Sequence, residues 1–266
     1  MHTPAHFTKP IEVMPLAVHR RLLPDWGTTY GPADAGPHPA VLVLHGSEGG
    51  LSGWSHRTAA ILAASGFLAY PHAYSKGGNA WNAGSIETIE LFRTVEALKS
   101  LRSFAACNGR VALYGVSRGA EHALLVASLM AQEQLEGAAD AVACLAAPDV
   151  VCGAFDARSF RDAGDPGWQA WDPAQRAWAW RGRSDNLMPT TPIAVEDFEG
   201  PLFLAAGMKD QTWSPQMTKR LEARRRDHGL GVEAHYYMDE GHVPGSEGEN
   251  EHHRLLIDFL ERTLRD

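Results

Sequence analysis

A serine between two glycines is the residue of this 266-residue chain best placed for covalent chemistry. The run Gly115–Gly119 reads G-V-S-R-G, between an expected strand over Arg110–Tyr114 and an expected helix over Arg118–Gln132. In such a turn the serine stands on a sharp bend, and the glycines let the chain approach itself closely. The helix N-terminus offers free N–H groups and a partial positive charge. The pattern therefore predicts that Ser117 is a nucleophile.

A serine hydroxyl needs a base to take its proton and an acid to orient that base. When the nucleophile stands on such a turn, the acid and then the histidine follow it, in loops after later strands. His242 comes just after an expected strand, Val232–Met238, and the preceding Gly241 leaves its loop free to aim the ring. We therefore expect His242 to be the base. Other histidines fit worse, because they precede the nucleophile or lie within strands and helices: His45, His122, His235, His252 and His253.

The acid has one favoured position and one rival. Asp210 follows the expected strand Leu202–Ala206 and a glycine turn, so it is the expected acid. Asp149 follows the preceding expected strand, Ala141–Ala146, and some enzymes of this architecture take their acid there. Its alternative interpretation is a loop residue beside Pro148. Asp185 and Asp239 read as solvated loop charges.

A tetrahedral oxyanion needs two hydrogen-bond donors. One is expected to be the backbone N–H of Arg118, the residue after the nucleophile. The other is expected from Ser47, in the loop after a continuous apolar strand, Ala40–His45, with Glu48 as the alternative. Each such donor is worth about 3–4 kcal/mol when it is deleted. A phosphate-binding turn fits Gly46–Gly50 poorly, because the run lacks the spacing and the Lys-Ser/Thr ending.

The elements around these residues alternate between strand and helix, which predicts a parallel sheet wrapped on both sides. An edge strand or hairpin is expected near Ile11–Leu23 and a short strand over Phe67–Pro71. Four more helices are expected at the following ranges: Ser55–Ser65, Ile86–Arg102, Pro215–His228 and His252–Leu264. One domain over residues 1–266 accounts for the length.

One stretch, Cys152–Gly200, shows neither helical nor strand periodicity. A long irregular stretch within a domain is often a lid or a binding loop. Its tryptophans argue against disorder, and two interpretations stay open: a satellite core, or a cap over residues 153–199 that lines an apolar pocket. The expected substrate-binding residues are Trp168, Trp171, Trp178, Trp180 and Trp213.

Arginines gather in the same stretch and beside the nucleophile. They are Arg118, Arg158, Arg161, Arg181 and Arg183. They suit either a solvated rim with surface ion pairs or a site for a carboxylate or the phosphates of a CoA thioester.

The net charge of the chain argues against two classes of binding partner. Lys+Arg is 24 against Asp+Glu 32, a net charge of −8, which argues against nucleic acid and against a polybasic membrane surface. The cysteines form no C-x-x-C pair, and no apolar run approaches the roughly 20 residues of a membrane span. The N-terminal residues lack the positively charged segment and the apolar run that together indicate a signal peptide. We expect a cytoplasmic protein, a homodimer being compatible with the sequence.

Longer segments resemble a known superfamily. His45–Gly50 reads H-G-S-E-G-G, Gly115–Glu121 reads G-V-S-R-G-A-E, Ala179–Gly182 reads A-W-R-G, and residues 200–215 hold G-P-L-F-L-A-A-G, D-Q and W-S-P. Over about residues 40–264 the chain resembles α/β-hydrolases. The narrower likeness is to the catalytic domain of acyl-CoA thioesterases and bile acid-CoA:amino acid N-acyltransferases, near the dienelactone hydrolases. The resemblance implies Ser117, Asp210 and His242 as the triad. The acyltransferases use cysteine instead, so the serine favours hydrolysis.

These observations predict a doubly wound, mostly parallel α/β fold with a small Trp-rich cap. The expected activity is that of a serine hydrolase cleaving carboxylic esters of apolar or aromatic acyl groups through an acyl-enzyme. An acyl-CoA thioesterase is the alternative, and a non-catalytic ligand-binding homologue is the second. The expected partner is a small-molecule ester or thioester, and neither a metal nor an organic cofactor is required.

Overall fold

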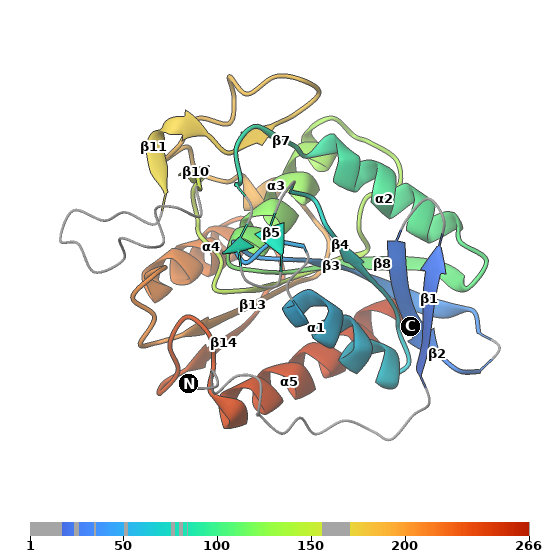
Figure 1. Cartoon of the computed structure of the whole chain (residues 1–266). Coiled ribbons are helices and arrows are strands. Elements are labelled where there is room, and N and C mark those ends of the chain that lie inside the picture. The colour runs from blue at the N-terminus through green and yellow to red at the C-terminus, as the bar shows by residue number, and fades with distance from the viewer. Residues whose placement is uncertain are drawn as a thin grey trace.

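The chain folds around one mostly parallel sheet, seen in a computed structural model (Figure 1). The structure describes residues 18–23, 27–34, 36–50, 53–75, 78–79, 82–83, 85–155 and 171–265. The sheet has eight strands in the order β1-β2-β4-β3-β8-β9-β13-β14. β2 pairs antiparallel with β1 and with β4, and the other neighbours pair in parallel. The expected doubly wound fold is confirmed.

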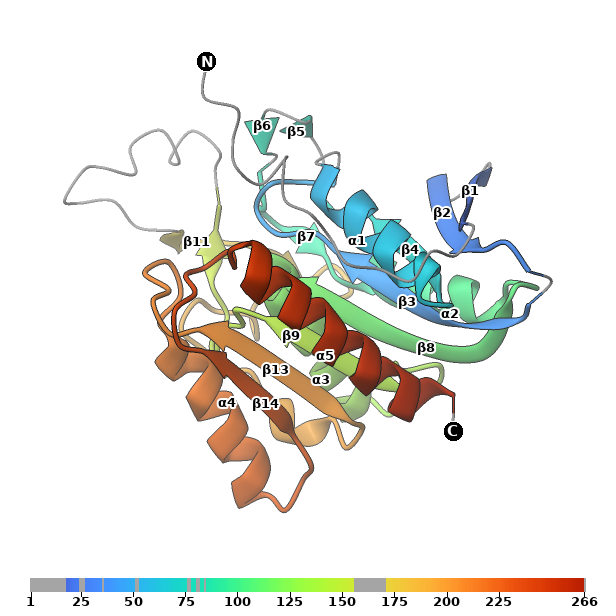
Figure 2. The ribbon, with the colours of Figure 1, turned by 90° about the horizontal axis from the view of Figure 1, so that it is seen from below.

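Both faces of the sheet are buried, because apolar residues follow one another along the central strands. In β3 (His38–Leu44), Ala40, Leu42 and Leu44 join one core cluster, while Val41 and Val43 join the other. Helices α2 (Phe92–Ser103), α3 (Arg118–Gln132) and α4 (Pro215–Asp227) pack on the first cluster. Helices α1 (Gly53–Ala64) and α5 (Ser246–Leu264) cover the opposite face (Figure 2). Helices on both faces are what a parallel sheet requires.

The parallel strands end on the side of the sheet that carries the candidate site, and β2 runs the opposite way. Their bounds are β1 Val18–Leu23, β2 Gly27–Pro32, β4 Leu68–His72, β8 Cys107–Val116, β9 Ala141–Leu145, β13 Leu202–Gly207 and β14 Glu233–Tyr237. The edge strand or hairpin expected near Ile11–Leu23 overlaps β1, which is the edge strand of the sheet and pairs with β2; residues 11–17 lie outside the described residues.

Two expected helix starts are wrong. The helix expected from Ile86 begins only at Phe92, because residues before it pair with another segment: the amides of Ile89 and Leu91 donate to the carbonyls of Ala177 and Ala179. Tertiary pairing has overridden local helical periodicity. The last helix starts at Ser246, before the expected His252.

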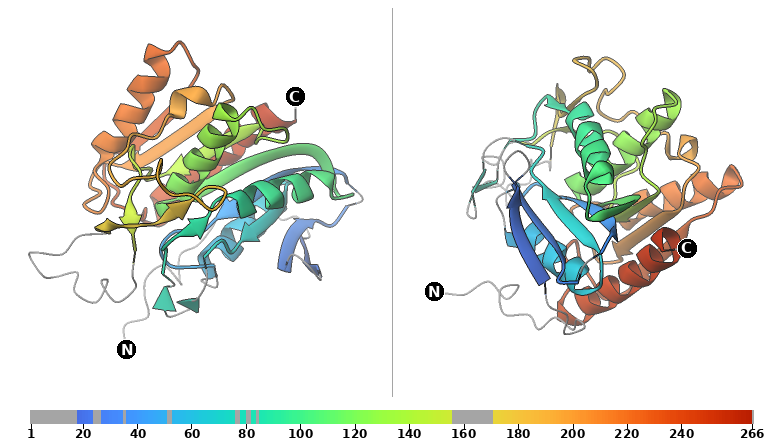
Figure 3. Two further views of the ribbon diagram at one scale, coloured as in Figure 1. Left: turned by 90° about the horizontal axis from the view of Figure 1, so that it is seen from above. Right: turned by 90° about the vertical axis from the view of Figure 1, so that its right-hand side faces the viewer.

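Residues 152–200 form short strands rather than a regular element. β10 (Gly153–Ala154) pairs with β11 (Asp172–Arg176), and β12 (Trp178–Ala179) pairs with β7 (Ile89–Glu90). A 3₁₀ turn at Val195–Asp197 and a small pair, β5 (Gly78–Asn79) with β6 (Asn82–Ala83), complete the described elements. Figure 3 shows β10 and β11 beside the main sheet. No helix in the described part of the chain is long and apolar enough to span a membrane.

Candidate active site

The turn between β8 and α3 holds Ser117 in a conformation that few residues adopt. Its φ is 56° and its ψ is −119°. The glycines are required by space: a Cβ on Gly115 would lie 2.1 Å from the carbonyl oxygen of Gly119, and a Cβ on Gly119 would lie 2.3 Å from that of Leu44. Any side chain at these positions would push α3 away from β3 and β8. Strain of this kind persists only where the surroundings enforce it, and it is commonest at active sites.

The three residues expected to form a triad lie together. Ser117 Oγ is 3.0 Å from His242 Nε2, and His242 Nδ1 is 2.8 Å from Asp210 Oδ2. A carboxylate can only accept, so the Nδ1–H donates to Asp210 and the bare Nε2 accepts the serine hydroxyl proton. The Asp210 side chain is 1% exposed and that of His242 is 22% exposed. This arrangement can remove a proton from Ser117 as it attacks a carbonyl.

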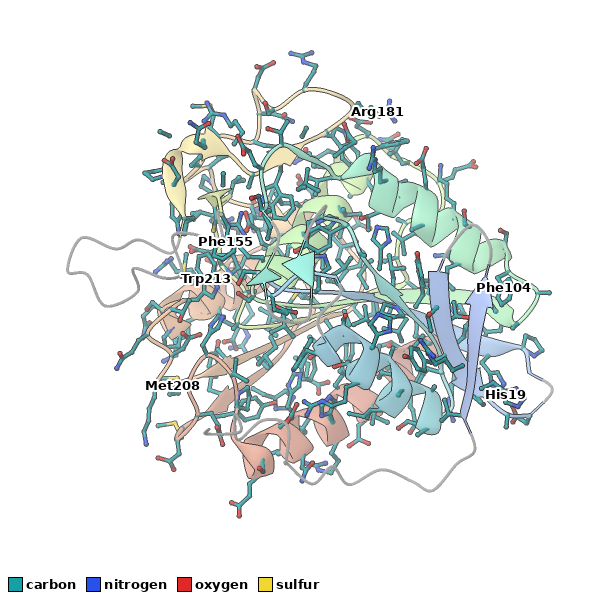
Figure 4. The ribbon with its side chains drawn as sticks, viewed as in Figure 1. His19, Phe104, Phe155, Arg181, Met208 and Trp213 are labelled. Atoms are coloured by element: carbon teal, nitrogen blue, oxygen red, sulfur yellow. The ribbon has the colours of Figure 1, made fainter. Side chains whose placement is uncertain are left out.

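Asp210 is oriented by its own loop. Its Oδ1 accepts hydrogen bonds from the backbone N–H groups of Thr212, at 2.8 Å, and Trp213, at 2.9 Å. These bonds satisfy the oxygen that does not face His242, so the buried carboxylate keeps partners on both sides. The indole of Trp213 is 5% exposed, and its Nε1–H donates to Ser117 Oγ at 2.8 Å. Trp213 is one of the residues expected to bind substrate, and the structure places its polar atom on the serine oxygen. Figure 4 shows its position.

The loop after β3 presents the N–H of Ser47. His45 Nδ1 donates to the carbonyl of Gly46 at 2.7 Å, and burial lowers the pKa of His45 to about 4, so its ring is neutral. The His45 ring stacks on Tyr74 at a centroid distance of 3.9 Å, and the Tyr74 hydroxyl donates to the His45 carbonyl. In a trans peptide the carbonyl of one residue and the N–H of the next point in opposite directions. The Ser47 N–H therefore points away from His45, and no described residue accepts a bond from it.

Glu48, the alternative donor, is engaged within the loop. Its carboxylate accepts from the Gly46 N–H at 2.8 Å. Burial raises the pKa of the Glu48 carboxyl. The backbone N–H groups of Gly46 and Glu48, and the charge of His242, oppose this shift but are smaller effects. Because the Glu48 N–H faces its own carboxylate, Ser47 is the better-placed donor. A Cβ on Gly46 would be 3.2 Å from the Val116 carbonyl, so this loop lies against the serine turn.

The Arg118 side chain points into the protein while its backbone begins α3. It pairs with Glu121 at 2.9 Å, donates to the Gly153 carbonyl at 2.8 Å and lies 5.2 Å from the centre of the Trp178 ring. Glu121 also accepts from the Trp178 indole at 2.7 Å and from the Cys152 N–H at 2.6 Å. This buried cluster joins the serine turn to the start of the irregular segment. No described residue accepts a bond from the Arg118 N–H, which leaves it for a ligand.

The rival acid lies elsewhere. Asp149 accepts hydrogen bonds from Nε and Nη2 of Arg220, at 2.5 and 2.8 Å, whereas the His242 ring is bonded to Asp210. Two other histidines form hydrogen bonds away from the triad. His122 bonds to the Thr94 hydroxyl, and His252 bonds to the hydroxyls of Tyr114 and Tyr237. Their burial lowers the pKa of both rings.

The described tryptophans of the expected cap each pack in the protein interior or on its core. Trp178 is fully buried on Glu121, and Trp180 donates to Glu133 at 2.6 Å and packs on Phe92. Trp171 packs against the core cluster that also holds Trp213, and its ring would lie 3.1 Å from a Cβ on Gly153. Trp168, with Arg158 and Arg161, lies outside the described residues. Of the residues that the structure describes, no group of three or more His, Cys, Asp or Glu could hold a metal.

Sequence reasoning missed the inward-facing contacts. The Trp213 bond to Ser117 and the His45 bond to Gly46 depend on the packing of distant loops. One signal was available for Trp213: it stands three residues after Asp210, where an aspartate commonly accepts the backbone N–H groups of the following turn.

Comparisons with known proteins identify the family and the fold. Residues 82–266 match the model of the prolyl oligopeptidase family. No curated protein matches the chain. Acylaminoacyl peptidase of Pyrococcus horikoshii is 13% identical with a TM-score of 0.65, and the match covers 95% of this chain and 42% of that one. The chain thus spans less than half the length of that peptidase.

Two esterase structures are similar over most of their own length. A truncated carbohydrate esterase from gut microbiota has 14% identity and a TM-score of 0.63, with 97% of this chain and 100% of that one covered. An esterase from Rhizomucor miehei has 15% identity and a TM-score of 0.64, with 96% and 86% covered. At such identities the likeness concerns the fold.

The expected α/β-hydrolase superfamily is confirmed, while the narrower likeness to acyl-CoA thioesterases stays a prediction. Because the family model matches more than half of the chain, the protein belongs to the prolyl oligopeptidase family and is a serine hydrolase of the α/β-hydrolase fold.

Proposed function

We propose that this hydrolase cleaves carboxylic esters of apolar or aromatic acyl groups through an acyl-enzyme on Ser117. The observation that carries the proposal is the unbroken hydrogen-bond chain from Ser117 through His242 to Asp210, at 3.0 and 2.8 Å. The triad stands beside two backbone N–H groups, of Ser47 and Arg118, that are free to hold an oxyanion.

Each residue then has a defined step. Ser117 Oγ bonds to the ester carbonyl carbon while its proton passes to His242 Nε2. The carbonyl oxygen becomes an oxyanion between the N–H groups of Ser47 and Arg118. His242 returns the proton to the leaving alcohol as the carbon–oxygen bond breaks. A water molecule then attacks the acyl-enzyme, its proton going to Nε2 and on to Ser117 Oγ, which leaves. Asp210 keeps the imidazole in the required tautomer throughout.

The surroundings favour a neutral, apolar ester. Val243, the residue after His242 in the chain, is 58% exposed, so an apolar side chain next to the base in sequence is open to a ligand. Three of the arginines that could hold the phosphates of a CoA thioester lie in the described residues, and each forms an ion pair with a carboxylate. The pairs are Arg118 with Glu121, Arg181 with Glu133 and Arg183 with Asp185. These arginines are therefore not free cations for the phosphates of a CoA thioester, and a neutral ester needs no such cation.

Ester and thioester substrates of one acyl length test the proposal. Hydrolysis of p-nitrophenyl butyrate and butyryl-CoA should favour the ester in kcat/KM, with a KM for the ester that is level between low and high salt. Ser117→Ala should abolish turnover, by about 10⁶-fold, and leave the circular dichroism spectrum unchanged. A faster thioester reaction whose KM rises with salt would mean a thioesterase. No turnover of either substrate, or an active Ser117→Ala protein, would overturn the proposal.

A further inference from the structure

Trp213 contacts both ends of the triad. Its backbone N–H donates to Asp210 Oδ1 at 2.9 Å, and its indole N–H donates to Ser117 Oγ at 2.8 Å. Those two triad residues lie on different strands and loops, and Trp213 bridges them from the turn between β13 and α4. A tryptophan that served only to bind substrate or fill the core would not need its one polar atom on the nucleophile.

The serine oxygen has three directions for its partners, and the structure fills two of them. The hydroxyl proton goes to His242 Nε2, and one lone pair accepts the Trp213 N–H. One lone pair remains for the substrate carbonyl. Because these two bonds are made to partners on different loops, they fix the rotation of the hydroxyl and direct the remaining lone pair at the substrate.

Burial makes this indole a fixed donor. Trp213 is 5% exposed and Ser117 is 8% exposed, so water competes little for either group. An indole N–H can only donate, and it cannot be titrated, so it keeps the same role at every pH. Its hydrogen bond strengthens as Ser117 Oγ gains negative charge while losing its proton.

Building on the proposed function, we propose that Trp213 is a catalytic residue whose indole N–H stabilises charge on Ser117 Oγ. During acylation it favours the partly anionic oxygen that forms as the proton moves to His242. During deacylation the same oxygen is the leaving group, and the indole stabilises it until His242 returns the proton. Both steps lose this stabilisation together when the N–H is removed.

The test uses a substitution that leaves the backbone in place. Trp213→Phe removes the indole N–H but keeps the backbone bond to Asp210. A hydrogen bond to a charged group predicts a fall of about 10- to 100-fold in kcat for p-nitrophenyl butyrate. The rate at which diethyl p-nitrophenyl phosphate modifies Ser117 should fall by a similar factor, because that reaction reports the nucleophile. The matched control is Trp180→Phe, which loses an indole bond to Glu133, away from Ser117, and should keep the wild-type values.

A second replacement separates the N–H from the volume of the ring. Benzothienylalanine at position 213 keeps the bicyclic shape and replaces N–H with sulfur. It should lower kcat by the same factor of about 10 to 100, and this expectation holds even if the Phe variant misfolds. Wild-type rates with this residue, or equal losses in Trp180→Phe, would overturn the role of Trp213. The wild-type protein and Ser117→Ala serve as references: if they do not differ, the proposed function itself has failed.

Discussion

The acid of the triad gives the sharpest prediction, because two aspartates competed for the role. Asp210 is buried and uses Oδ2 for His242 and Oδ1 for two backbone N–H groups. An asparagine there keeps one acceptor oxygen. That oxygen stays with the backbone donors, so the amide NH₂ faces His242 Nδ1. The ring must then carry its proton on Nε2, where it cannot accept from Ser117.

The expected loss for Asp210→Asn is about 10⁴-fold in kcat, equivalent to about 5.5 kcal/mol, as the same change costs in a serine protease triad. Asp149→Asn should change kcat less than about threefold. Its carboxylate pairs with Arg220, whose side chain is 56% exposed, so the loss is about 1 kcal/mol of stability.

Steady-state kinetics with p-nitrophenyl butyrate and thermal melts of both variants provide the measurement. Ser117→Ala defines the background rate, and titration of active sites with an organophosphate corrects for misfolded protein. A larger loss in Asp149→Asn than in Asp210→Asn, or equal losses, would refute the assignment of the acid.

Three further predictions concern the framework. Glu121→Ala should lower the free energy of unfolding by about 3–5 kcal/mol in urea titrations, because it leaves Arg118 buried without its partner, whereas the surface Glu133→Ala should cost under about 1 kcal/mol. Gly119→Ala should give misfolded or inactive protein in melts and assays, because its Cβ would meet the Leu44 carbonyl at 2.3 Å. Burial lowers the pKa of His253 to about 4. In the unfolded chain the pKa of this ring is about 6.5, so between pH 6.5 and pH 4 the ring is protonated only when the chain unfolds. The free energy of unfolding that depends on neutral His253 is therefore fully present above pH 6.5 and falls by about 1.4 kcal/mol per pH unit down to pH 4. His253→Leu should remove that part of the slope, and an unchanged slope would contradict the assignment.

Local sequence patterns predict the α/β fold and put Ser117, His242 and two candidate acids in loops at one edge of the sheet. The continuous apolar run Ala40–Leu44, rich in β-branched residues, favours a strand covered on both sides, and the G-x-S-x-G run favours a sharp strand-to-helix turn. The expected helix Arg118–Gln132 is observed with the same bounds. Asp210 and His242 follow strands whose ends meet at one edge of the sheet, so local patterns were enough to place them there.

Tertiary structure decided what local patterns leave open. The choice of Asp210 over Asp149 depends on which carboxylate reaches His242 and which reaches Arg220, across 32 and 71 residues of sequence. Ile89 and Glu90 form strand β7 instead of the first turn of a helix, because the amides of Ile89 and Leu91 donate to the carbonyls of Ala177 and Ala179, although the spacing of residues 86–91 is helical. The indole of Trp213 meets Ser117 across 96 residues. Such contacts come from the packing of loops that the sheet brings together, and hydrophobic periodicity carries no information about them.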